Sequence, residues 1–246
     1  MDIKKGYSYL TCLEQLSDRL YRHSLAVAWL TLKLGLTLNV DVLTLENLVV
    51  GALFHDIGKI LLPTIISKSG RLTEQENHLL RKHPELGAWL LKKLGCSAAT
   101  LDCVRYHHER WDGGGEAGLS GLGIPIEARL VALADSWDGA TATLSKCTWD
   151  RSQLKGIHRL KKRRGRELDP QLVELFLDQH VITGATFAMW EKEISTARNC
   201  LHNLFDTYKT LNHPVVYVQS RYLDDLTNCY HVQKKDQKKR PLLLHG

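Results

Sequence analysis

Hydrophobic residues recur every three to four positions along most of the chain, which is the period of an α-helix packed on a core. The first stripe consists of Leu13, Leu16, Leu20, Val27, Leu30 and Leu34. It predicts one long helix, which Gly35 is expected to end. A second stripe is formed by Leu45, Leu48, Val49, Ala52 and Leu53. It places His55 and Asp56 at the C-terminal end of its helix.

Local signals mark further helix boundaries. Thr73-Glu74-Gln75-Glu76 is typical of a capping box, in which the first and last side chains satisfy the free N–H groups of a helix start. Pro84 and Pro125 stand where a first helical turn tolerates proline, and Gly95 is expected to end the helix after Pro84. The best strand pattern, Val215-Val216-Tyr217-Val218, also fits a helix. The pattern therefore predicts an all-α protein.

The pattern weakens in two places. Six glycines fall between residues 111 and 124, which predicts a flexible loop there. The helical period is also weak over residues 181–186. Two further stripes follow, on either side of a turn at Asn212-His213-Pro214, and they predict a helical hairpin. We therefore expect a domain at 1–180, a linker at 181–190, a hairpin at 191–231 and a basic disordered tail at 232–246.

Composition limits the class of protein. The 246 residues are 43% hydrophobic, enough for a core, and carry a formal net charge of +6. Basic clusters at 161–166 and 234–240 accompany no nucleic-acid-binding motif, so we interpret them as solvated charge. The six cysteines lack metal-type spacing, and no apolar run approaches the ~18 residues that span a bilayer. We expect a cytoplasmic protein that binds neither membranes nor nucleic acid polymers.

Histidines and aspartates supply the candidate chemistry. Taken singly, each has a structural explanation: His23 could be a satisfied core residue, His83 a helix cap and Asp135 an exposed carboxylate. Taken together, five histidines and two aspartates exceed the needs of one tetrahedral zinc but suit two metals that share a carboxylate. These ligand types suit iron or manganese. The set is His23, His55, Asp56, His83, His107, His108 and Asp135.

The order of these residues carries a family resemblance. The matching blocks are His55-Asp56-Ile57-Gly58-Lys59-Ile60, Gly70-Arg71-Leu72-Thr73, His83-Pro84-Glu85-Leu86-Gly87, His107-His108-Glu109-Arg110-Trp111-Asp112-Gly113, Ile124-Pro125-Ile126-Glu127-Ala128-Arg129, Ala134-Asp135 and Asp169-Pro170. On these blocks, roughly residues 15–178 resemble the HD-GYP branch of the HD superfamily of metal-dependent phosphohydrolases. The resemblance implies an all-α, multi-helix bundle that holds two divalent metal ions, often iron or manganese.

The resemblance also implies a role for each ligand. One ion would be held by His23, His55, Asp56 and Asp135, and the other by His83, His107 and His108, with Asp56 as the bridge and a catalytic residue. Lys59, the second catalytic residue, would bind the substrate phosphate and neutralise charge that grows on its oxygens. Some relatives hold a third metal through a glutamate four residues before the first histidine. That position is Arg19 here, so we expect two ions.

Two parts of the family pattern are altered. The Gly-Tyr-Pro signature is replaced by Gly115-Glu116-Ala117, which places an acidic residue near an expected dinucleotide phosphate. A basic stretch after Asp135 that binds cyclic di-GMP in relatives is replaced by Leu144-Ser145-Lys146-Cys147, in which only Lys146 could bind phosphate. Losing one such contact costs roughly 1.5–3 kcal/mol.

We therefore expect the protein to be a cyclic dinucleotide phosphodiesterase with cyclic di-GMP as its substrate. Two alternatives stay open: a metal phosphohydrolase for another phosphoester, and a catalytically weak adaptor that senses a nucleotide and controls the hairpin.

Residues 191–231 carry a second resemblance, to the small sporulation-type aspartyl-phosphate phosphatases. It rests on the helical hairpin and on Ser220, Leu223 and Asp224, which match a Ser-x-x-Leu-Asp motif. It implies dephosphorylation of a sporulation response regulator, with Asp224 at the acyl phosphate and its Mg²⁺. Arg221-Tyr222 replaces the usual glutamate of the motif. The alternative is an amphipathic hairpin used for docking or for a homodimer.

Overall fold

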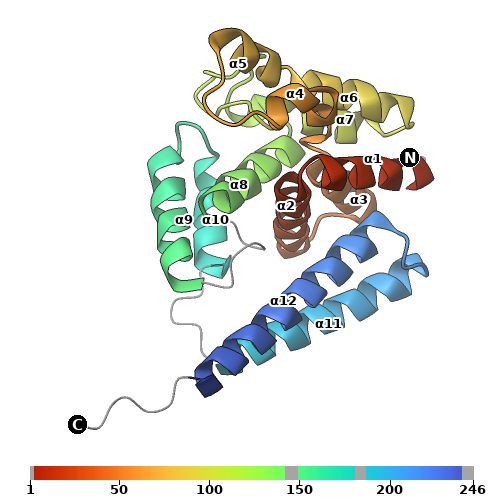
Figure 1. Cartoon of the computed structure of the whole chain (residues 1–246), viewed down its shortest axis with the longest axis vertical. Coiled ribbons are helices and arrows are strands. Elements are labelled where there is room, and N and C mark those ends of the chain that lie inside the picture. Colours follow the sequence, from red (N-terminus) through yellow and green to blue (C-terminus); the bar gives the residue numbers. More distant parts are fainter. Residues whose placement is uncertain (1–2, 142–148, 181–186, 240–246) are drawn as a thin grey trace.

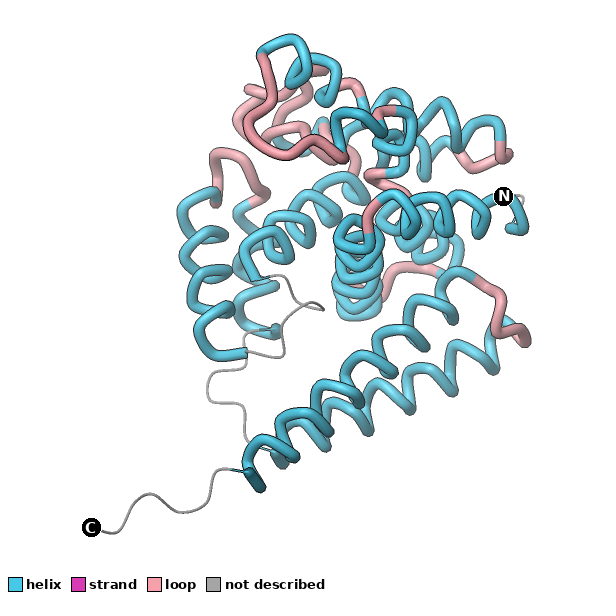
Figure 2. The backbone as a smooth tube through the Cα atoms, in the orientation of Figure 1, coloured by secondary structure: helices cyan, strands magenta, loops and turns pink. Residues whose placement is uncertain are grey.

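The computed structural model describes residues 3–141, 149–180 and 187–239, which form helices joined by loops and no strand (Figures 1 and 2). The all-α prediction is confirmed. The elements in chain order are α1 (Ile3–Leu16), α2 (Asp18–Thr37), α3 (Val42–Leu53), the 3₁₀ turn η1 (Ile57–Leu61), α4 (Pro63–Ile66), α5 (Glu74–Arg81), α6 (His83–Lys93), α7 (Ala98–Tyr106), the 3₁₀ turn η2 (Gly121–Gly123), α8 (Ile126–Thr141), α9 (Trp149–Arg163), α10 (Pro170–His180), α11 (Phe187–Tyr208) and α12 (Pro214–Lys239).

The first hydrophobic stripe is divided between two helices, so the prediction of one long helix is wrong. The Ser17 side chain caps α2 by accepting a hydrogen bond from the backbone N–H of Leu20. Gly35 does not end α2, which continues to Thr37. A Cβ at Gly35 would lie 2.7 Å from a methyl carbon of Leu45. The glycine is therefore needed for the close packing of α2 on α3.

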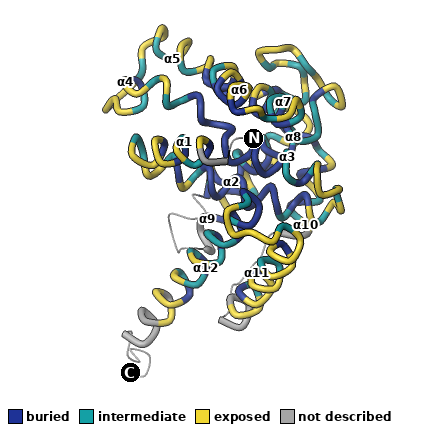
Figure 3. Tube along the Cα trace, turned by 90° about the vertical axis from the view of Figure 1, so that its right-hand side faces the viewer, coloured by how far each residue is buried: buried dark blue, intermediate teal, exposed yellow. Residues whose placement is uncertain are grey.

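Helices α2 and α3 form the centre of the bundle, and their buried positions are visible as the dark interior of Figure 3. Helix α8 packs against α2 and α3, α7 packs against α3 and α8, and α6 packs against α7 and η1. The predicted capping box at Thr73 and Glu76 is confirmed at the start of α5. Gly95 adopts a φ of +71° just after α6, as expected of a residue that ends a helix.

The hairpin of α11 and α12 packs along the bundle (Figure 1) and shares its hydrophobic core. The ring of Trp29 in α2 stacks on Tyr222 in α12 with centroids 3.6 Å apart. Lys33 in α2 forms an ion pair with Glu193 in α11, with a 3.0 Å separation. Residues 215–218 are helical, and α12 continues to Lys239. The backbone is thus helical over the first eight residues of the segment where we expected a disordered tail.

The basic cluster at the end of α9 is partly neutralised by neighbouring acids. Arg163 pairs with Glu167, Arg164 with Glu174 at 2.6 Å, and Arg166 with Glu167 at 2.7 Å. These pairs agree with solvated surface charge. Among the described helices, none is both long and apolar enough to cross a lipid bilayer.

Candidate metal centre

Three predicted ligands stand where helices begin or end, and we refer to His55, His83 and His107 as the helix-end wall. His55 follows α3, His83 starts α6 and His107 follows α7. All three are buried, and each Nδ1 lies 2.7–2.8 Å from the carbonyl oxygen three residues earlier. A carbonyl can only accept, so Nδ1 carries the proton and Nε2 keeps a lone pair. Local helix-end geometry therefore fixes both the tautomer and the direction of each ring.

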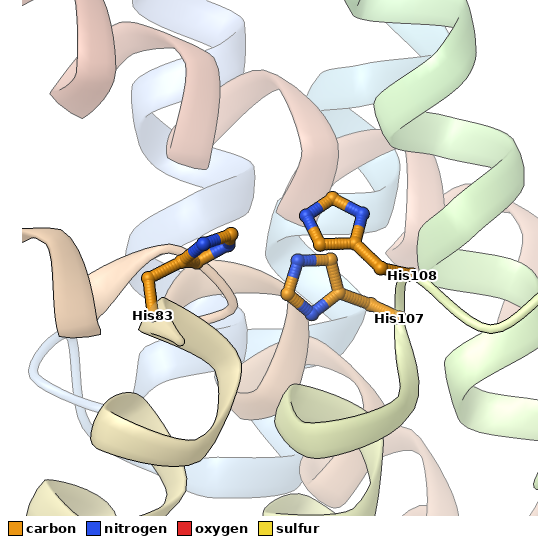
Figure 4. Close-up of side chains that lie close together, drawn as sticks. All are labelled: His83, His107 and His108. Atoms are coloured by element: carbon orange, nitrogen blue, oxygen red, sulfur yellow. The ribbon is translucent and has the colours of Figure 1, made fainter. Parts of the chain in front are cut away.

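The Nε2 atoms of the helix-end wall are buried and have no hydrogen-bond donor. The Asp56 oxygen 3.1 Å from His83 Nε2 is itself an acceptor and cannot satisfy its lone pair. Burying such a group without a partner costs about 1–3 kcal/mol. Figure 4 shows the His83 ring turned toward His107 and His108. Desolvation lowers the pKa of His108 to about 4 and that of His107 well below its usual range, so both stay neutral. Buried lone pairs on neutral imidazoles are suitable ligands for a cation.

The opposite side of the site is charged, and we refer to His23, Asp135 and Asp138 as the α2–α8 wall. His23 Nε2 lies 3.0 Å from Asp135 Oδ1, and His23 Nδ1 lies 2.7 Å from Asp138 Oδ2. Burial alone would lower the pKa of His23, but the hydrogen bonds to the two aspartates raise it to about 10. The pKa of Asp135, which burial alone would raise, is lowered to about 2 by its hydrogen bond to His23.

The sequence reasoning missed Asp138. It stands three residues after Asp135, a spacing that places both carboxylates on one face of a helix. That spacing was the available signal. Asp135 belongs to the same helix as Asp138. It lies inside α8, with about 1.7 helical turns following it.

Asp56 lies between the two walls. Its Oδ1 is 3.1 Å from His83 Nε2, and its Oδ2 is 3.5 Å from His55 Nε2 and 3.9 Å from His23 Nε2. Lys59 Nζ approaches the same Oδ2 at 2.6 Å. Burial alone would raise the pKa of Asp56, but the adjacent Lys59 ammonium group holds it well below its usual range. The position suits a carboxylate shared by two cations.

All seven predicted ligands fall into three overlapping groups, within each of which the ligand atoms lie no more than 4.8 Å apart. These groups are His83, His107 and His108; His23, His55 and Asp135; and His55, Asp56 and His107. The first contains the three histidines expected around one ion, and the second contains three of the four residues expected around the other. The donor set and the unpartnered Nε2 atoms fit divalent metal ions.

A pocket of about 510 Å³ opens onto this centre, a volume within the usual range for small-ligand sites. Lys59 lines it together with the α2–α8 wall and with Asp56 and His108. Glu116, expected near a substrate phosphate, is exposed and does not line this pocket. Lys146 lies outside the described residues.

The glycine-rich loop after His108 is hydrogen-bonded to Glu109. The buried Glu109 carboxylate accepts hydrogen bonds from the backbone N–H groups of Ala117 at 2.8 Å and Leu119 at 2.9 Å. A Cβ at Gly115 would lie 2.6 Å from Glu109 Oε1, so the loop can close on this carboxylate only with glycine there. Glu109 thus positions the segment that follows the two histidines.

The hairpin motif lies on α12, and none of its residues lines the pocket. Asp224 is exposed, Ser220 is half-buried, and Leu223 packs against the hydrophobic core. Because Leu223 faces the core, only part of the motif is open to a partner.

Comparison with known proteins agrees with this geometry. A family model described as "HD domain" matches residues 11–172. A cyclic di-GMP phosphodiesterase of Vibrio cholerae is 36% identical over 143 residues, which cover 54% of this chain and 29% of the relative. A cyclic di-GMP phosphodiesterase of Pseudomonas aeruginosa is 34% identical over 174 residues, which cover 68% of this chain and 41% of the relative. The chain spans less than half the length of these relatives.

A solved structure gives the same fold. The crystal structure of a cyclic GMP-AMP-specific phosphodiesterase of Vibrio cholerae matches with a TM-score of 0.56 and 19% identity, over 73% of this chain and 49% of that chain. At this identity the likeness supports the helical architecture alone.

Proposed function

The chain belongs to the HD-domain family, and on that premise we propose that it is a metal-dependent phosphodiesterase that hydrolyses a cyclic dinucleotide, with cyclic di-GMP as the substrate. The observation that carries the proposal is the set of buried, unpartnered Nε2 atoms of the helix-end wall beside the ionised Asp56. Relatives named cyclic di-GMP phosphodiesterases support the choice of substrate.

Each residue has a proposed role that its surroundings support. His23, His55, Asp56 and Asp135 would hold one iron or manganese ion, and Asp56, His83, His107 and His108 the other. Such a pair supplies a water of low pKa for attack on phosphorus and neutralises charge on the phosphate oxygens.

The residues around the ligands orient them and would bind the substrate. Asp138 accepts a hydrogen bond from the Nδ1–H of His23, and so directs Nε2 toward the centre. Lys59 lines the pocket, where its ammonium group would bind a phosphate oxygen.

The proposal is tested by metal analysis and hydrolysis. Protein purified without oxygen should contain two equivalents of iron or manganese, and should hydrolyse cyclic di-GMP faster than 3′3′-cyclic GMP-AMP, cyclic di-AMP or a mononucleotide phosphoester. Faster turnover of another substrate would support the alternative phosphohydrolase. Tight binding without turnover at full metal loading would support the nucleotide-sensing adaptor, and the absence of metal, binding and turnover would end the proposal.

For the hairpin we propose a docking role toward a response regulator of the sporulation type, in which Ser220, Leu223 and Asp224 contribute to dephosphorylation. The exposure of Asp224 supports this role, because its carboxylate is open to a partner. A phosphorylated response regulator of this type should lose its acyl phosphate faster with the protein present. Asp224→Asn should abolish the effect, whereas Asp206→Asn, an exposed change on α11, should not. Equal rates with and without the protein would refute it.

A further inference from the structure

The charged residues that line the pocket are almost all paired with one another. Asp18 pairs with Arg22 at 2.9 Å, and Asp56 pairs with Lys59 at 2.6 Å. Asp135 and Asp138 both contact His23. Each acid of the pocket lining thus has a nearby cation.

Arg19 is the exception among the described lining residues. Its side chain lines the pocket and is exposed, and it forms no hydrogen bond or ion pair with the described part of the chain. Holding an arginine at a pocket wall without an acidic partner leaves five N–H donors and a full positive charge to bind a ligand. The pocket therefore contains one cationic group that the protein does not itself neutralise.

The position of Arg19 relative to the metal centre is set by α2. Arg19 and His23 are four residues apart, so they lie on the same face of the helix, about 6 Å apart along its axis. A ligand group bound by Arg19 would therefore lie beside the metal centre, not on it. Arg22, by contrast, is engaged by Asp18 through its Nε.

We infer that Arg19 binds the second, non-reacting phosphate of the cyclic dinucleotide and so determines the preference for substrates with two phosphates; the inference rests on the proposed function. A cyclic dinucleotide carries two phosphodiesters, and only one can occupy the metal centre at a time. The other carries a negative charge that needs a partner, and a guanidinium group binds phosphate oxygens in bidentate geometry. Arg19 supplies that partner at the pocket wall.

The test compares two substrates in the metal-loaded protein. Arg19→Gln should raise KM for cyclic di-GMP by about 10- to 150-fold, the effect of one charge-assisted contact. It should leave kcat nearly unchanged, because the contact forms equally in the ground and transition states. With bis(p-nitrophenyl) phosphate, which has one phosphodiester, Arg19→Gln and wild type should behave alike. Arg19→Lys should restore part of the affinity.

A control and a binding measurement separate the possible outcomes. Arg198→Gln removes the same charge from an exposed position on α11 outside the pocket. It should change neither KM nor kcat with either substrate. Calorimetry with a phosphorothioate analogue of cyclic di-GMP should show the same 10- to 150-fold weakening for Arg19→Gln. Unchanged KM and Kd in this variant would overturn the inference, as would an equal loss with both substrates, because Arg19 would then act on the centre itself.

Failure of the proposed function gives a different result. Wild-type protein that binds cyclic di-GMP without hydrolysing it would refute the phosphodiesterase and leave calorimetry to decide on Arg19. Wild-type protein that neither binds nor hydrolyses it would refute both.

Discussion

The helix-end wall and the α2–α8 wall prepare a cation site in opposite ways. In the first, burial and a backbone hydrogen bond at Nδ1 give His55, His83 and His107 a free lone pair at Nε2. In the second, two carboxylates hold His23, whose pKa rises to about 10. The helix-end wall offers lone pairs that lack a positively charged partner. The α2–α8 wall instead carries a proton on His23, at the nitrogen where the cation should bind.

This difference shows how metal binding would act on each wall. At the helix-end wall a cation would relieve unsatisfied buried groups without displacing a proton. At the α2–α8 wall it would replace the proton on His23 Nε2 and keep the hydrogen bond from Nδ1 to Asp138. Asp56, which contacts both walls, would couple the two effects.

The largest loss of activity should come from removing the Asp56 carboxylate, which couples the two walls. A metal ion contributes several kcal/mol to a phosphoryl-transfer transition state, and each 1.36 kcal/mol is a factor of ten. Asp56→Ala should therefore lower hydrolysis by roughly 1000-fold or more and lower the metal content of the purified protein. Asp102→Ala, a change of the same kind on α7, should do neither. Activity that survives Asp56→Ala would rule out the proposed centre.

Metal binding should stabilise the fold through the helix-end wall. With free metal at about 100 times its Kd, the free energy of unfolding should rise by about 2.7 kcal/mol, or roughly 5–11 °C in Tm for a chain of this size. His107→Ala should greatly reduce this shift, while His78→Ala, at an exposed position on α5, should retain it. Differential scanning calorimetry with and without metal measures both. A full shift in His107→Ala would contradict the ligand role.

A smaller effect should come from Asp138, which touches the metal only through His23. Asp138→Asn should weaken metal binding by about 10- to 100-fold, as for other residues that orient a ligand. Asp206→Asn, on the exposed surface of α11, is the matched control. Metal titration followed by calorimetry gives both affinities. If Asp138→Asn binds metal as tightly as wild type, the carboxylate does not orient His23.

The effect of pH is graded, and it is the smallest for a change of one pH unit. Because the folded-state pKa of His23 is raised to about 10, His23 is protonated at neutral pH and must lose one proton to bind metal. Affinity should therefore increase about tenfold per pH unit between roughly pH 7 and 9. His107 and His108, with lowered pKa values, add no proton in this range.

The same raised pKa affects the metal-free fold. Its contribution to stability is complete below the unfolded pKa of about 6.5 and is lost as pH rises through about 10. His23→Gln should flatten both pH profiles. A steep profile that persists in His23→Gln would assign the proton to another group.

Short-range signals in the sequence determined most of the helices and the ligand set. The capping box at Thr73 needs only contacts within four residues, and it was predicted correctly. The ring orientations of the helix-end histidines are also local, since each ring is fixed by a carbonyl three residues away. The family blocks around them then indicated a metal centre.

Contacts between distant segments decided the features of the fold and of the site that short-range signals do not predict. Gly35 looks like a helix end in the sequence, but close packing against Leu45 explains it. Glu109 accepts hydrogen bonds from the backbone of the glycine-rich loop, and Asp138 joins His23 across 115 positions of chain. The sequence by itself determined which residues could bind metal. Only the tertiary structure decided which carboxylate orients His23 and which arginine has no acidic partner, because both depend on how α2, α8 and η1 meet around one pocket.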